Sequence, residues 1–496
     1  MTSTTTNNGS HTAYLSPLDQ YMPRIYVTIY LIFDTPDPSA AVNTLQAGVK
    51  ELGSRLPYLR GSISTPEDPR GRMAITWSSS DAPLSLHPTP TSLGTNPPPY
   101  QQLRAENAPL HYFANTFPAL IQTRTAANPG SPGSPAFAAS YTLLDSAVVL
   151  GIAAHHSLAD GTGVLELIRV LAACTSHTPL PPSLSPLPDE PLHRHTLLHS
   201  ALPSPKEEPP LSFSTRLASL PEFCILSSPE VTTSQANATD SSAPKGRAKL
   251  FTFSAARLET AREVLRAGEY HLDPAALSTN NILTAVIWAC VSRARAARRG
   301  GGGGWAESGS GSGRSKMGFA INGRRQLKGE VSTRPYAGNV NLFGVPEFTS
   351  EMLEGIGAKC SATGGGAAAL AQVVKSIWEA IRRVDAGHVA DVVALMEQAG
   401  DFAGDVGPSW VRSNGPDLSV TSWANMDVYG CEFGEGLGRP VYMRVPDFVA
   451  DGLVVVLPRD RTGREGKGEG IEVVVVLCAD DVRFLEGDEV WGSWLV

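Results

Sequence analysis

A long apolar run that ends abruptly in two histidines constrains the fold of this sequence more than any other feature. Residues 147–154 read Ala-Val-Val-Leu-Gly-Ile-Ala-Ala, and His155 and His156 follow at once. A run of this kind predicts a strand that is buried on both faces, within a longer strand-like stretch over residues 138–154. The chain therefore needs a sheet that other elements cover on both sides.

Strand and helix patterns alternate through both halves of the chain. Expected strands lie at 24–33, 249–253, 419–423, 453–457 and 472–477, and expected helices begin at Ser39 or span 163–173, 255–267, 279–295 and 366–384. A chain of 496 residues is too long for one typical core. The repeated pattern favours two similar α/β domains that face each other.

Composition shifts divide the chain into three parts. Residues 175–248 are dense first in proline and then in Ser, Thr and Asn, which predicts an exposed crossover or linker. The expected domains are then residues 1–174 and 249–496. Residues 299–315 are rich in Gly and Ser, which predicts a disordered surface loop inside the second domain.

Several classes of function find no support in the composition. The net charge is −8 with a pI near 5.8, and no basic stripe is present, so nucleic acid is not an expected partner. Six scattered cysteines form no CxxC pair, which argues against a disulfide framework or a zinc cage. The first 12 residues contain no apolar segment and no apolar run reaches membrane-spanning length, so we expect a cytoplasmic protein with no membrane partner.

Three histidines form a candidate metal site by their spacing. His193, His195 and His199 have the spacing of metal ligands on one helix face. They lie in a proline-rich stretch with no fourth ligand nearby, so the sequence predicts no metal site.

The strongest candidate for chemistry follows the apolar run and reads His155-His156-Ser-Leu-Ala-Asp160-Gly161. A histidine at a strand end can project into a cleft, and its neutral imidazole is a suitable base near pH 7. Asp160 can close the turn, and Gly161 lets the backbone pass close to it. The alternative is a structural histidine pair before a helix that Asp160 caps.

This pattern resembles the HHxxxDG signature of the CoA-dependent acyltransferase superfamily. The superfamily includes plant BAHD acyltransferases, fungal trichothecene 3-O-acetyltransferase-like enzymes and condensation domains of peptide synthetases. Further segments resemble the fungal branch in the same order along the chain: Leu15-Ser-Pro-Leu-Asp-Gln20, Pro23-Arg-Ile-Tyr26, Ser278 to Ala285 with Trp288, Asn322-Gly-Arg-Arg-Gln-Leu327, Gly338-Asn339, Ser422-Trp423 and Glu432-Phe-Gly-Glu-Gly436 with Gly438-Arg-Pro440.

The second signature departs from the family pattern Asp-Phe-Gly-Trp-Gly. Glu432 stands in place of Asp and Glu435 in place of Trp, while Phe433, Gly434 and Gly436 match. The family resemblance implies that this loop is mainly structural, so we expect the departures to be compatible with activity.

The resemblance implies two domains of the chloramphenicol-acetyltransferase type, with an active-site tunnel between them and His156 as general base. Asp160 would pair with Arg324 and, with Gly161, shape the site; the alternative is a relay in which Asp160 hydrogen-bonds His156. His155, Ser422 and Trp423 are candidates for positions beside the substrates. Acyl-CoA, most simply acetyl-CoA, would be a co-substrate, with no permanently bound cofactor.

The acceptor implied by the resemblance is a hydroxylated, or amine-bearing, secondary metabolite, and the expected enzyme is a monomer. Two rival interpretations stay open. One is a condensation-type enzyme that takes its acyl group from a carrier protein, and the other is a non-acylating binding protein on the same scaffold. The segments Ser422-Trp423 and Glu432-Phe-Gly434 favour the CoA-dependent branch.

Overall fold

The computed structural model describes most of the chain, and the statements below concern that part. It covers residues 4–5, 9–66, 71–89, 98–115, 133–180, 187–204, 211–225, 246–298, 313–359, 366–399, 406–410, 415–446, 448, 450–462 and 470–496.

The apolar run forms the centre of the first large sheet. Strand β9 (Ala147–His155) is buried at all nine positions. It pairs antiparallel with β3 (Tyr26–Asp34) on one side and with β8 (Phe137–Leu143) on the other. The stretch 138–154, expected to be one strand, is thus a hairpin that turns at residues 144–146. The strand order is β17-β3-β9-β8-β6, with β6 at Leu86–Pro88.

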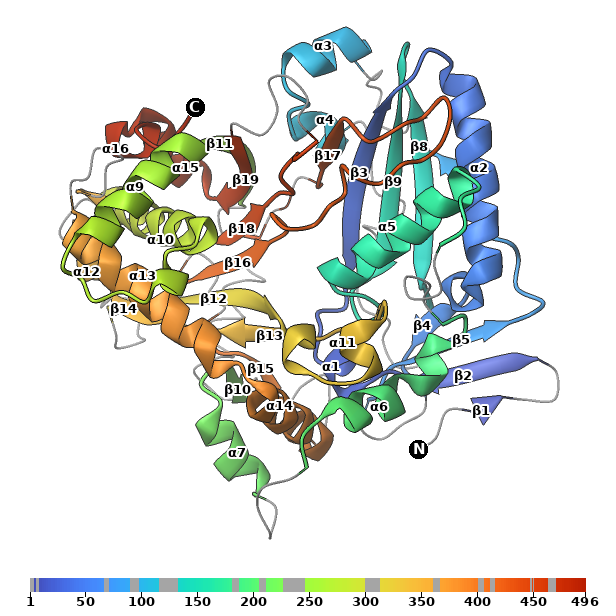
Figure 1. Cartoon of the computed structure of the whole chain (residues 1–496), viewed down its shortest axis with the longest axis horizontal. Helices are drawn as coiled ribbons and strands as arrows, with labels where there is room; N and C mark the ends of the chain where they lie inside the picture. The colour runs from blue at the N-terminus through green and yellow to red at the C-terminus, as the bar shows by residue number, and fades with distance from the viewer. Residues whose placement is uncertain are drawn as a thin grey trace.

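Helices cover both faces of this sheet, as the apolar run requires. Helices α2 (Pro38–Arg55) and α5 (Gly161–Thr175) share one hydrophobic cluster with alternate residues of β3 and β9. The opposite face packs on α3 (Tyr100–Ala105) and α4 (His111–Asn115). Figure 1 shows α2 and α5 beside strands β3, β9 and β8.

Smaller elements complete the first half of the chain. A second sheet has the order β1-β2-β5-β4-β7. Its strands are Thr4–Thr5, Ser10–Tyr14, Ala74–Ser78, Ser62–Ser64 and Ser134–Pro135, and the short helices nearby are α1 (Pro17–Gln20) and η1 (Pro57–Arg60).

The second large sheet is built from the C-terminal half and lies apart from the first in Figure 1. Its order is β11-β19-β18-β16-β12-β13, and β14 also pairs with β12. The strands are Arg247–Ser254, Gly470–Leu477, Leu453–Val456, Leu418–Ser422, Arg314–Asn322, Asn341–Gly344 and Glu347–Thr349. The helices that pack with it in one cluster are α9 (Ala255–Ala267), α10 (Thr279–Arg298), α12 (Ser350–Gly357), α13 (Ala367–Arg383), α15 (Ala479–Gly487) and α16 (Glu489–Gly492).

The structure differs in two ways from the expected division of the chain at residues 174 and 249. Strand β17 (Tyr442–Arg444) pairs with β3, so the first sheet takes one strand from the C-terminal half. The segment expected to be an exposed linker contains helices α6 (Glu190–Ala201) and α7 (Phe213–Ser219). It also contains β10 (Phe223–Ile225), which pairs with β15 (Val406–Pro408). Regular elements therefore occupy these parts of the predicted crossover or linker, and the division into domains stays a prediction.

Most of the expected Gly/Ser loop, residues 299–312, lies outside the described residues. Its last two positions, Arg314 and Ser315, already belong to β12, and Ser315 is fully buried where it accepts a hydrogen bond from Nε1 of Trp288 at 2.8 Å. The last two residues of the predicted loop thus belong to the strand instead. Within the described part of the chain, no helix has both the length and the apolar character needed to cross a membrane.

Candidate active site

The candidate base His156 lies in the turn between β9 and α5. Its main-chain N–H donates to the carbonyl of Ile25 at 2.8 Å, and the carbonyl of His155 accepts from Leu158 N at 2.7 Å. Asp160 then caps α5, because its Oδ1 accepts from Gly163 N at 2.9 Å. A strand end, a tight turn and a capped helix together fix the main chain on both sides of the histidine.

The Asp160 carboxylate is turned onto Arg324, which lies in the short helix η5 (Gly323–Gln326) after β12. Nη1 of Arg324 donates to Oδ2 at 2.8 Å and Nη2 donates to Oδ1 at 3.0 Å. Val340 N also donates to Oδ2, at 3.0 Å. The two side chains are 8% and 10% exposed, so this is a buried bidentate pair. The pairing expected of Asp160 and Arg324 is present, and the described structure contains no hydrogen bond from Asp160 to the imidazole of His156. Asp160 is both the helix cap and the partner of Arg324.

The carboxyl of Asp160 is held in its ionised form. Burial alone would raise the pKa of Asp160, but the Arg324 charge and four hydrogen bonds outweigh it, and the pKa of this carboxyl is lowered. A buried ion pair of this kind fixes geometry more than it adds net stability.

The segment 336–340 supports the turn from its other side. Arg324 donates to the carbonyl of Tyr336 at 3.0 Å and to that of Gly338. Nδ2 of Asn339 donates to the main-chain carbonyl of His156 at 2.9 Å. The side chain of Asn339 therefore contacts the main chain of the candidate base His156 directly.

Three further charged side chains hold this segment in place. Oδ1 of Asp19 accepts from both N and Nδ2 of Asn339, each at 2.8 Å. The carboxylate of Glu190 accepts from the backbone N–H groups of residues 337 and 338, at 3.0 and 3.2 Å. Arg194 joins the two carboxylates, at 3.3 Å to Asp19 and 2.9 Å to Glu190. All three are at most 1% exposed.

The expected site set did not include Asp19, Glu190, Arg194 or Asn339. Asp19 and Asn339 stand in two segments that resemble the family, and the capping box Ser16-x-x-Asp19 at α1 is a further local signal. Nothing in the spacing joins residue 19 to residue 339, because that contact depends on the tertiary fold.

Burial lowers the pKa of His156, and the charge of Asp160 and hydrogen bonding to Asn339 act in the opposite direction without offsetting it. The residue still keeps part of its surface exposed. At pH 7 the imidazole is therefore neutral, which is the form that can accept a proton.

His155, expected beside the substrates, has structural contacts on its own side of the strand end. Its Nδ1 accepts from Ser157 N at 3.2 Å, and its ring packs edge-on against Tyr26 with centroids 5.2 Å apart. Burial lowers the pKa of His155 to about 4. These contacts favour a packing role for His155.

The structure brings Trp423 to the turn that carries Asp160. A Cβ placed on Gly161 would lie 2.8 Å from Nε1 of Trp423 and 2.7 Å from Cε of Met426. Gly161 thus allows α5 to begin against this indole. Ser422 is the half-buried last residue of β16, directly before Trp423.

The second-signature loop lies at the other end of α5. A Cβ on Gly434 would be 2.9 Å from the Cα of Ser176, just after the last residue of the helix, and Phe433 packs on Phe33 with ring centroids 4.8 Å apart. Helix α5 has 15 residues, so this contact is about 22 Å along the helix from Asp160. The loop positions α5 and does not line the turn of His156.

Glu432 takes part in the local structure of that loop. Its Oε1 accepts from Gly434 N at 3.3 Å and its Oε2 lies 3.4 Å from Nε of Arg439. Gly434 and Gly436 have backbone φ angles of +93° and +82°, a conformation that residues other than glycine rarely adopt. The substitution of Glu for Asp at 432 thus keeps a carboxylate that serves the turn.

Gly163→Ala should destabilise the protein, because the new Cβ would lie 2.0 Å from the carbonyl oxygen of Ala337. Relieving that overlap must move α5 away from the segment that supports His156, at a cost of about 1–3 kcal/mol or more in the free energy of unfolding. Thermal and urea unfolding would measure it. The matched control is Gly355→Ala in α12, where a Cβ meets nothing within 4 Å; that variant should be unchanged or up to about 1 kcal/mol more stable. Equal effects of the two substitutions would contradict the close contact.

An α/β fold with two large sheets, and an HHxxxDG turn bound to an arginine of the other half, defines a class, the HHxxxDG acyltransferases. The model of the Transferase family matches residues 112–490, and that of the trichothecene 3-O-acetyltransferase-like N-terminal domain matches residues 25–174. The chain belongs to this Transferase family, is an acyltransferase and has the BAHD-type fold. The predicted family, fold class and enzyme class are thereby confirmed.

Curated relatives align over the full length. Trichothecene 8-O-acetyltransferase of Fusarium sporotrichioides is 28% identical over 514 residues, which span 98% of each chain. O-acetyltransferase ptmV of Penicillium ochrochloron is 25% identical over 524 residues, 97% of this chain and 96% of that one. The crystal structure of F. sporotrichioides TRI101 complexed with coenzyme A and T-2 has the same fold, with a TM-score of 0.72, 21% identity and coverage of 97% and 98%.

Proposed function

We propose that this chain is an acyl-CoA-dependent O-acyltransferase that transfers an acetyl group to a hydroxyl of a fungal-type secondary metabolite, with His156 as general base. The observation that carries the proposal is the half-buried, neutral imidazole of His156 on a turn that the Asp160–Arg324 pair holds in place. The names of the relatives support the choice of a hydroxyl as acceptor and of acetyl as the acyl group.

In the proposed mechanism His156 accepts the proton of the acceptor hydroxyl as its oxygen attacks the thioester carbonyl. The tetrahedral intermediate then collapses and expels the thiolate of coenzyme A, which takes up the proton from the imidazolium. The products are an ester and free coenzyme A. Base assistance of this kind contributes about 10²–10⁴-fold, and the positioning of both substrates contributes further. The tunnel implied by the family would bring the two substrates to His156 from opposite sides.

Coenzyme A enters the proposal as a co-substrate and not as a bound cofactor. The support is a solved relative of the same fold that was crystallised with coenzyme A. Chain halves that are joined by buried contacts such as Asp160–Arg324 fit a monomer, and the monomeric state and cytoplasmic location stay predictions that gel filtration and fractionation can test.

The direct test is incubation of the purified chain with acetyl-CoA and a panel of hydroxylated sesquiterpenoids, including trichothecenes with a free hydroxyl. We expect release of free thiol and a product that is heavier by one acetyl group in mass spectrometry. An amine panel tests N-acylation in parallel. Transfer only from an acyl carrier protein, or binding of acceptors with no transfer from any acyl-CoA, would contradict the proposal in favour of one of its two rivals.

The pH dependence of kcat/KM should show an acid limb below pH 6.5. Burial lowers the pKa of His156, so the imidazole stays neutral at pH values below the ordinary histidine pKa. Activity is lost only as the pH falls through the lowered pKa. A pH series with a saturating donor and a limiting acceptor measures this. An acid limb centred at or above pH 6.5 would contradict the environment assigned to His156.

A further inference from the structure

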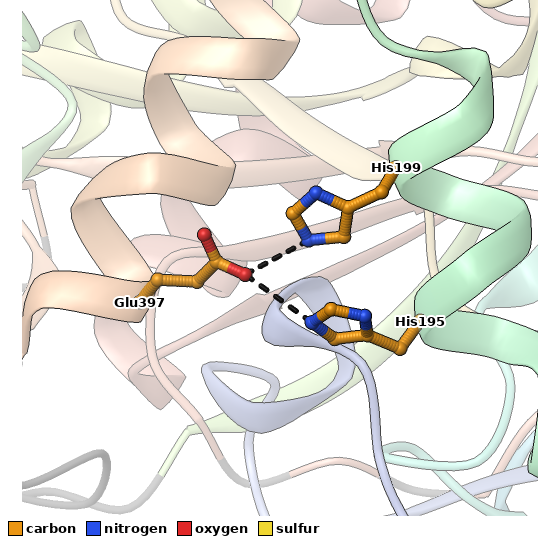
Figure 2. A group of neighbouring side chains, drawn as sticks. All are labelled: His195, His199 and Glu397. Carbon is orange, nitrogen blue, oxygen red and sulfur yellow. Dashed lines mark hydrogen bonds and ion pairs between the residues drawn. The ribbon is translucent and has the colours of Figure 1, made fainter. Parts of the chain in front are cut away.

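A second group of titratable side chains lies outside the candidate active site, where helices α6 and α14 (Ala386–Gln398) meet. His195 and His199 are one turn apart on α6, with ring centroids separated by 4.2 Å, and both rings face Glu397 of α14 (Figure 2). Oε1 of Glu397 is 2.8 Å from Nε2 of His199 and 3.4 Å from Nε2 of His195. The three ligand atoms lie within 4.8 Å of one another.

No metal site is predicted from the residues around these histidines, and the fold supplies a carboxylate ligand from far along the chain. Glu397 is 198 residues beyond His199. Both histidines lie on helix α6 within the predicted crossover segment, so their spacing of four residues places both rings on one face.

Both helices are anchored in one apolar cluster. Leu198 and Ala201 of α6 belong to the same hydrophobic cluster as Val393 and Met396 of α14. The two helices thus have apolar anchors that do not depend on the polar group. The three side chains are 37–64% exposed, which leaves the group open to solvent and to an ion.

We propose that His195, His199 and Glu397 bind a divalent transition-metal ion of the zinc class, with water in the fourth position. Two imidazoles and a carboxylate are a common ligand set for zinc, with Zn–N and Zn–O distances of about 2.0–2.2 Å. A tetrahedral site with such bonds separates its ligand atoms by roughly 3.3 Å, close to the 2.8 and 3.4 Å observed here.

The ligand set of the group suits a cation. Glu397 supplies a carboxylate, and the Nε2 atoms of both histidines lie next to its Oε1. On binding, the metal would replace the contacts that now join the imidazoles to the carboxylate, and each histidine would bind it through a neutral ring nitrogen.

The bound ion would tie the crossover segment to the C-terminal half. Helix α6 carries the exposed His195 and His199 together with the buried Glu190 and Arg194, which hold the segment that contacts His156. The expected effect of the metal is stabilisation of this helix, since an ion that binds only the folded state raises Tm with its concentration.

The experiment uses the untagged full-length chain, freed of metal with EDTA and then dialysed into chelator-free buffer. Titration with ZnCl₂ by calorimetry, and competition with a chromogenic chelator, should show one ion per chain. His195→Ala, His199→Ala and Glu397→Gln should each weaken binding by at least about tenfold, because even the loss of a group that only supports a ligand costs about 10–100-fold. The rise of Tm with zinc should shrink in the same three variants.

His193→Ala is the matched control, because His193 lies on the same helix, is 51% exposed and contacts Asp189 at 3.1 Å instead of Glu397. Its zinc affinity should equal that of the unmodified chain. No binding by the unmodified chain, or unchanged affinity in any one of the three ligand variants, would overturn the three-ligand site.

Discussion

His156→Ala is expected to lower the turnover of acyl transfer by about 10²–10⁴-fold or more and to leave Tm nearly unchanged. The base is lost, while the main-chain hydrogen bonds of residue 156, to Ile25 O and from Asn339 Nδ2, are available to alanine as well. The Asp160–Arg324 pair also holds the turn, and the substitution leaves that pair in place. Steady-state turnover and a thermal melt, measured on the same preparation, test both parts of this prediction.

His155→Ala is the control for that experiment, with the opposite expected pattern. His155 is 5% exposed and packs on Tyr26, so its loss should lower Tm, while turnover at a temperature where the variant is folded should fall by less than about tenfold. If His156→Ala kept turnover within about tenfold of the unmodified chain, the general-base role would be wrong.

Local sequence patterns predicted those elements whose boundaries depend on local chemistry. The helix expected at 255–267 has these bounds in the structure, with Ser254 as N-cap and Gly268 at its C-terminal end. The strand-like stretch at 138–154 gives little sign of the turn at residues 144–146 that makes it a hairpin. The proline-rich surroundings of helix α6 hide a helix that an ion pair from Arg194 to the distant Asp19 helps to hold in place.

The site divides in the same way. His156 and Asp160 were found from a local motif at a strand end, and the Arg324 partner came from family resemblance. Asn339 contacts the turn of His156 and is bound by Asp19, which lies 320 positions away. Their pairing is fixed by the way the two halves dock, which no local spacing encodes.

Asp160→Ala is expected to lower the free energy of unfolding by several kcal/mol and to abolish activity in parallel. The substitution leaves the guanidinium of Arg324 buried without its counter-charge, which costs about 3–5 kcal/mol, and removes the N-cap of α5, which costs about 1 kcal/mol more. The backbone N–H of Val340 also loses its acceptor. Urea unfolding of the variant and of the unmodified chain would measure the difference.

Asp160→Asn separates this structural role from a catalytic relay. Asparagine keeps the volume, one acceptor oxygen and good N-cap geometry, so its stability should lie between that of Asp160→Ala and the unmodified chain. If Asp160 instead oriented His156 through a hydrogen bond, the same variant would keep its Tm and lose about 10⁴-fold in kcat, as in the Ser-His-Asp triad. The bidentate geometry onto Arg324 at 2.8 and 3.0 Å predicts the first pattern. It also predicts that Asp160→Ala combined with Arg324→Met is less destabilised than the sum of the two single variants, since the second change removes the stranded charge. Strict additivity in that cycle would show that the two side chains do not depend on each other.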